Sequence, residues 1–111
     1  MIDGDATLRA AFSEALGVEG YSVRAVPPGP AALELLDEAA PSLVVMDPEL
    51  PKWGRWTVAA ALRVHAEGIP LLVLGAAGVV QRYAEELLAE GYLDKPFALA
   101  DLVMTVARMC G

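Results

Sequence analysis

Short apolar runs alternate with helical patterns of apolar residues along the chain. The runs Leu43–Met46 and Ile69–Leu74 are apolar almost throughout, which is typical of strands covered on both faces. Tyr21–Val26 is a further short strand candidate that ends at a Pro-Pro-Gly-Pro cluster, and Tyr92–Asp94 is a brief last one. The pattern therefore predicts short strands at these positions, separated by helices.

The helical segments carry apolar residues at three- and four-residue spacing, as at Leu8, Phe12 and Leu16. Asp5 precedes the first of these segments and is a predicted N-cap. The segments predict helices over Ala6–Val18, Ala31–Ala39, Trp56–Ala66, Val79–Glu90 and Ala98–Met109, with loops over Asp47–Arg55 and Gly75–Gly78.

Regular alternation of helices and apolar strands predicts an α/β fold with a doubly wound parallel sheet between two layers of helices. The length of 111 residues predicts a single domain over residues 1–111. In such sheets ligands bind beyond the carboxyl ends of the strands, where the strand order reverses. Asp47, Gly75 and Lys95 follow predicted strands, and Asp3 and Asp5 precede the first helix. These positions are the candidates for a functional site.

Composition and charge exclude several classes of protein. A hydrophobic content of 56% excludes disorder, and the net charge of −7 with only two lysines, Lys52 and Lys95, argues against nucleic-acid binding. The longest apolar stretch, Ile69–Val80, is shorter than the roughly 20 residues that span a membrane. The single cysteine, Cys110, cannot form an intrachain disulfide. No signal peptide is recognisable, so we expect a cytoplasmic protein.

Four segments carry a resemblance to a known family, each weak alone and specific together. They are IDGDATLR (2–9), SLVVMDPELP (42–51), IPLLVL (69–74) and YLDKPF (92–97). In order and spacing they resemble the response-regulator receiver domain, the flavodoxin-like, CheY-like module of two-component phosphorelay signalling. The resemblance covers essentially the whole chain.

The resemblance implies a role for individual residues. Asp47 matches the aspartate that accepts a phosphoryl group from a histidine kinase or phosphotransfer protein, and a carboxylate is a suitable nucleophile for that reaction. Lys95 matches the lysine that pairs with the phosphoryl oxygens. Asp3, Asp47 and the backbone carbonyl of Glu49 match the Mg²⁺ ligands. Tyr92 matches the aromatic switch residue, through which phosphorylation would alter the binding of a downstream protein partner.

Two glycines depart from the family pattern. Gly4 stands at the second acid of the metal-binding pair, and Asp5 is a poor substitute if it caps the helix. Gly75 stands where the family has a serine or threonine hydroxyl that binds the phosphoryl group. We therefore expect weak Mg²⁺ binding, slow phosphorylation and poor coupling to Tyr92.

The first strand of the family is also reduced here, because only Met1 and Ile2 precede Asp3. We expect four full strands with a truncated first strand, or a strand borrowed from a second copy in a homodimer. The resemblance further implies a cis peptide bond between Lys95 and Pro96.

Two functions stay open from the sequence. Asp3, Asp47 and Lys95 favour a phosphoaccepting receiver, whereas Gly4 and Gly75 favour a degenerate pseudo-receiver that binds a protein partner without phosphorylation. An enzyme on the same fold is a third possibility, but no nucleophile–base pair supports it and fold alone does not establish function.

Overall fold

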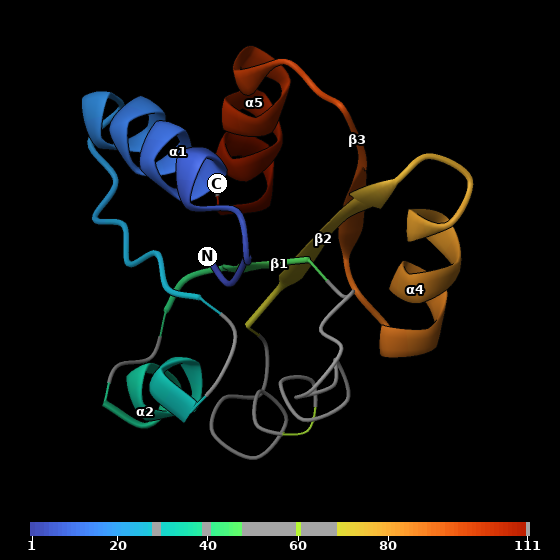
Figure 1. Cartoon of the computed structure of the whole chain (residues 1–111), viewed down its shortest axis with the longest axis horizontal. Coiled ribbons are helices and arrows are strands. Elements are labelled where there is room, and N and C mark those ends of the chain that lie inside the picture. Colours follow the sequence, from blue (N-terminus) through green and yellow to red (C-terminus); the bar gives the residue numbers. More distant parts are fainter. Residues whose placement is uncertain (28–29, 39–40, 48–59, 61–68, 111) are drawn as a thin grey trace.

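The computed structural model describes residues 1–27, 30–38, 41–47, 60 and 69–110. The strands β1, β2 and β3 pair in parallel, in that order. Helices lie on both sides of this sheet, which confirms the predicted α/β fold (Figure 1). The elements are α1 (Ala6–Val18), α2 (Pro30–Glu38), β1 (Val44–Met46), β2 (Leu71–Ala76), α4 (Val80–Leu87), β3 (Gly91–Lys95) and α5 (Leu99–Cys110).

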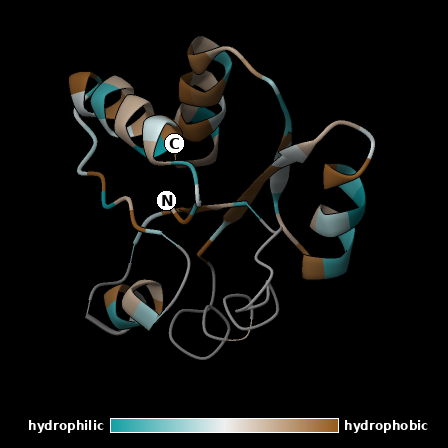
Figure 2. Ribbon diagram, in the orientation of Figure 1, coloured by the Kyte–Doolittle hydropathy of each residue, from teal (hydrophilic) through white to brown (hydrophobic). Residues whose placement is uncertain are grey.

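Side chains on the two faces of the sheet enter two separate hydrophobic clusters. Along β2, Leu71 and Val73 pack with residues of α4 and with Ala32 of α2. Leu72 and Leu74 pack on the opposite face with residues of α1 and α5. The apolar run thus belongs to a strand buried on both faces, and Figure 2 shows hydrophobic residues along β2. This arrangement gives the three predicted layers.

Ile2 takes the place of a first strand. It forms parallel bridges with both Val26 and Met46, so the spatial order is Val26, Ile2, β1, β2, β3. The predicted strand over Tyr21–Val26 is wrong, because Val26 alone of these residues is in a bridge. A strand needs a partner along its length, and the partner here is the short segment around Ile2.

The start of α1 agrees with the prediction. Asp5 caps the helix, and its Oδ1 accepts hydrogen bonds from the amides of Thr7 and Leu8 at 3.0 and 3.2 Å. The predicted Lys95–Pro96 cis bond is also confirmed. None of the helices within the described ranges has the length and hydrophobicity needed to cross a membrane.

One predicted loop is corrected by the structure, and one predicted helix lies outside the described residues. The predicted loop over Gly75–Gly78 is wrong at its start, because β2 continues through Gly75 to Ala76, which pair with residues of β3. The predicted helix over Trp56–Ala66 lies outside the described residues, apart from position 60.

Glu90 fixes the beginning of β2 relative to the beginning of β3. Its amide donates to the carbonyl of Leu71 at 3.0 Å. Its Oε2 accepts from the amide of Leu71 at 3.1 Å. One residue therefore satisfies both backbone groups of Leu71, at the end of the sheet opposite the carboxyl edge.

Leu88 ends α4 in a conformation that favours glycine. Its φ is 56°, and its side chain is 71% exposed. We expect Leu88→Gly to raise the free energy of unfolding by about 1 kcal/mol, because it removes the strain of a Cβ in the left-handed region. Chemical denaturation measures the change. Leu88→Ala keeps the Cβ and should give no comparable gain, and equal gains in both variants would contradict the strain argument.

Candidate functional site

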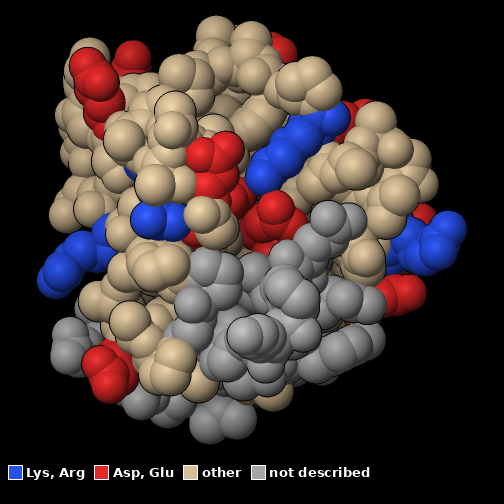
Figure 3. Space-filling model, in the orientation of Figure 1, with Lys and Arg blue, Asp and Glu red and all other residues tan. Residues whose placement is uncertain are grey.

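Asp3, Asp47 and Lys95 meet at the carboxyl edge of the sheet, as the sequence predicted. The Nζ atom of Lys95 lies 3.0 Å from Oδ2 of Asp3 and 3.0 Å from Oδ2 of Asp47. Figure 3 shows acidic and basic side chains in contact near the middle of the face of the molecule that is in view. The lysine thus joins residues 92 and 48 positions away in the chain.

Strand pairing positions each of the three side chains. The Asp47 amide donates to the carbonyl of Ile2 at 3.0 Å, and the Ile2 amide donates to the carbonyl of Val45 at 2.8 Å. Asp3 and Asp47 therefore follow adjacent, paired residues. Lys95 ends β3 opposite Ala76, so all three side chains arrive at one edge.

Asp3 is the most enclosed member of the cluster, with 2% of its surface exposed. Its Oδ1 accepts a hydrogen bond from the amide of Asp5 at 2.8 Å, while Oδ2 accepts from Lys95. Its own amide donates to the carbonyl of Val26 at 3.3 Å. Burial of a carboxylate is tolerated when hydrogen bonds and a cation compensate for lost hydration, and this carboxylate has both.

Arg9 is a member of the site that the sequence analysis did not identify. Its Nη1 donates to the backbone carbonyl of Asp3 at 2.7 Å. The only signal in the sequence is position, since a long basic side chain early in α1 can reach back to the residues before the helix. Periodicity places Arg9 on the helix but does not reveal its target.

Two opposing effects act on the pKa of Lys95. Partial burial lowers it, but hydrogen bonds to Asp3 and Asp47, together with the charges of both carboxylates, outweigh burial and raise the pKa above its ordinary value. Lys95 therefore stays a cation throughout the neutral pH range.

The donor atoms are compatible with Mg²⁺ but few. Asp3 and Asp47 supply carboxylate oxygens, the hard ligands that Mg²⁺ prefers. Gly4 offers no side-chain oxygen, and Glu49 lies outside the described residues. In the described part of the chain, no three His, Cys, Asp or Glu residues gather as a metal-binding group. Asp5 is engaged as the helix cap, with its Oδ1 bound to the amides of Thr7 and Leu8.

Gly75 lies beneath a side chain of α4. A Cβ atom built at Gly75 would be 3.3 Å from both Cβ and Cγ2 of Val80, which is a tight contact. Val80 is fully buried. A hydroxyl-bearing residue at position 75 would therefore need Val80 to move, whereas a Cβ at Gly4 meets no atom within 4 Å.

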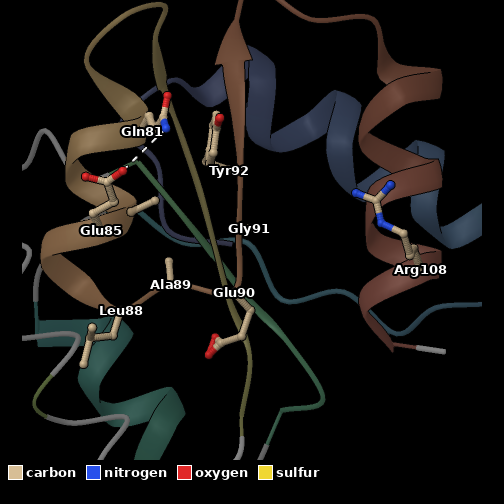
Figure 4. Close-up of a pocket in the computed structure, with 9 residues that line it drawn as sticks. Gln81, Glu85, Leu88, Ala89, Glu90, Gly91, Tyr92 and Arg108 are labelled. Carbon is tan, nitrogen blue, oxygen red and sulfur yellow. Dashed lines mark hydrogen bonds between the residues drawn. The ribbon is translucent and has the colours of Figure 1, made fainter.

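Tyr92 lies in a shallow hollow between α4, β3 and α5 (Figure 4). Its side chain is 42% exposed. Glu85 of α4 and Arg108 of α5 line the same hollow. Asp3, Asp47 and Lys95 are not among the residues that line this hollow.

Comparison with known proteins identifies relatives that match nearly the whole chain. Residues 1–107 match the family described as the response regulator receiver domain. The response regulator MprA of Mycobacterium sp. (strain KMS) is 35% identical over 111 residues, which cover 98% of this chain and 47% of that protein. MprA of Mycobacterium leprae (strain TN) is 33% identical over 110 residues and is covered to 48%. The chain spans about half the length of these curated relatives.

A solved structure supports the same assignment. The response regulator receiver protein from Burkholderia phymatum matches with a TM-score of 0.85 and 26% identity. The match covers 99% of this chain and 91% of that chain.

Lys95→Met removes the cation that Asp3 and Asp47 share. At neutral pH we expect the free energy of unfolding to fall by about 1–2 kcal/mol, less than for a fully buried pair because water reaches Lys95. Because folding raises the pKa of Lys95, its stabilisation is complete below the ordinary value of 10.5 and disappears as the pH rises through the higher folded value.

Chemical denaturation of both proteins between pH 7 and pH 11 measures this difference. Lys95→Arg keeps the positive charge and should retain part of the stability. A difference between wild type and Lys95→Met that is already lost at pH 8 would contradict the assignment.

Proposed function

The chain belongs to the response-regulator receiver domain family of two-component signalling, and we propose that it is an atypical receiver in which Asp47 accepts a phosphoryl group. A histidine kinase or phosphotransfer protein supplies that group, and a downstream protein partner responds to it. The observation that carries the proposal is the shared contact of Lys95 with Asp3 and Asp47 at 3.0 Å.

The geometry supports a defined chemical step. An Asp47 oxygen attacks phosphorus and forms a phosphorus–oxygen bond, while the bond to the donor's histidine nitrogen breaks and that nitrogen keeps the electron pair. The ammonium of Lys95 is placed to neutralise charge on the phosphoryl oxygens in the transition state. Asp3 and Asp47 would hold Mg²⁺, together with the Glu49 carbonyl, and a bound Mg²⁺ would supply further charge neutralisation.

Two glycines, Gly4 and Gly75, are the reason for proposing an atypical receiver. Gly4 leaves two carboxylates and one ammonium in the cluster, so the attraction for a divalent cation is reduced. Gly75 supplies no hydroxyl, and Val80 is packed against it. Both features predict slow labelling and weak transmission rather than loss of the fold.

A degenerate pseudo-receiver is the second candidate, supported by the packing of Val80 over Gly75. In that function the domain binds its protein partner whether or not Asp47 carries a phosphoryl group. We further propose that residues 1–111 form one receiver-like signalling domain that acts in the cytoplasm, is not an enzyme, and does not bind nucleic acid. Its net charge of −7 supports the last point.

Incorporation of phosphate from acetyl phosphate with Mg²⁺ tests the proposed function, with Asp47→Asn as the blank. We expect wild type to label at Asp47 and Gly4→Asp to label faster by about tenfold, because a third carboxylate strengthens Mg²⁺ binding. The Cβ environment of Gly4 is open, so the variant should fold normally.

Binding of beryllofluoride, a phosphoryl mimic, in the presence of Mg²⁺ separates the two candidate functions. Binding by wild type supports the receiver. If neither wild type nor Gly4→Asp labels or binds the mimic, the phosphoacceptor proposal is wrong and the pseudo-receiver remains.

Coupling between the acid site and Tyr92 can be tested at position 75. Gly75→Thr alone should lower the free energy of unfolding by about 1–3 kcal/mol, because the added side chain overpacks Val80. Adding Val80→Ala to Gly75→Thr removes the contact with Cγ2, although the Cβ of residue 80 remains 3.3 Å from the new Cβ. In that double variant we expect the NMR signals of the Tyr92 ring to shift on addition of beryllofluoride.

Val80→Ala alone is the matched control and should show no such shift. An equally large response of Tyr92 in wild type would mean that Gly75 does not weaken the coupling.

A further inference from the structure

Asp3 is buried, but the residues that follow it, Gly4 and Asp5, are exposed and are held by hydrogen bonds rather than by packing. Gly4 is exposed, and a Cβ placed there would meet no atom within 4 Å. Asp5 has its side chain committed to the first amides of α1. The orientation of the peptide between Asp3 and Gly4 therefore depends on what binds its carbonyl oxygen.

Arg9 binds that oxygen. Its Nη1 lies 2.7 Å from the Asp3 carbonyl, a short distance for a nitrogen–oxygen hydrogen bond and typical of a charged donor. The Arg9 backbone is itself fixed, because its amide donates to the carbonyl of Asp5 at 3.0 Å within the first turn of α1. The guanidinium thus connects a rigid helix to the residue that precedes it by six positions.

Rotation of the Asp3–Gly4 peptide would disturb the acid itself. The Asp3 carboxylate is bound through Oδ1 to the amide of Asp5, which lies beyond that peptide, and through Oδ2 to Lys95. A shift of the backbone would weaken both bonds together. We infer that Arg9 is a positioning residue, which holds the Asp3 backbone so that its carboxylate faces Lys95 and the cation site. This inference rests on the proposed function, because it concerns the same site.

Charge and positioning predict opposite effects of removing Arg9. If Arg9 acts only as a nearby positive charge, its loss should strengthen Mg²⁺ binding, since repulsion of the cation is removed. If Arg9 positions Asp3, its loss should weaken Mg²⁺ binding despite the charge effect. The sign of the change therefore identifies the role.

The experiment compares Mg²⁺ binding and amide hydrogen exchange by NMR in wild type, Arg9→Met, Arg9→Lys and Arg82→Met. Arg82 is exposed on α4, so its variant makes the same charge change on another helix. We expect Arg9→Met to bind Mg²⁺ about tenfold more weakly, at the lower end for residues that support metal ligands. The Asp5 amide should lose protection selectively, and Arg9→Lys should recover part of both properties.

Two results would overturn the inference: Mg²⁺ binding by Arg9→Met as strong as in wild type, or Asp5 protection that is unchanged or falls equally at all amides. Failure of the proposed function is distinguishable from both. In that case wild type neither labels nor binds Mg²⁺. The Asp5 amide, measured without Mg²⁺, still reports whether Arg9 positions Asp3.

Discussion

The pairing of Ile2 with its neighbours is the constraint on which the site depends. Its amide donates to the carbonyl of Val45, and its carbonyl accepts from the amide of Asp47. Asp3 and Asp47 therefore lie next to each other, at the ends of two paired segments. Parallel strands end at the same edge of a sheet, and β2 and β3 extend that alignment until Lys95 reaches both carboxylates. A few backbone hydrogen bonds near position 2 thus determine where the charged groups meet.

The charged cluster consists of one cation shared by two acids, with a second cation bound to the backbone beside them. Lys95 bridges Asp3 and Asp47, and Arg9 binds the backbone beside them. In the proposed receiver, Gly4 and Gly75 stand where an acid and a hydroxyl are expected at the periphery of the site. Under the proposed function these two positions would affect different steps: Gly4 the attraction of a cation, and Gly75 the transmission from the site toward Tyr92.

Much of the fold could be predicted because buried parallel strands and amphipathic helices have distinct periodicities. The start of α1, the Asp5 cap and the meeting of Asp3, Asp47 and Lys95 follow from local pattern and from parallel alignment. The strand over 21–26 could not be judged locally, because a strand exists only where a partner pairs with it. Arg9 was missed for a related reason: a side chain that binds a backbone carbonyl leaves no mark in hydrophobic periodicity.

Glu90 has a consequence for the charge of the site, although it lies at the other end of the sheet. By satisfying both backbone groups of Leu71, it favours one alignment of β3 against β2, in which Lys95 is opposite Ala76. A slip of one residue reverses the faces of a strand and would place Asp94 at that position. The edge would then present a third carboxylate in place of the ammonium. Glu90 thus helps to set the register of β3, and this register determines whether the site contains a positive charge.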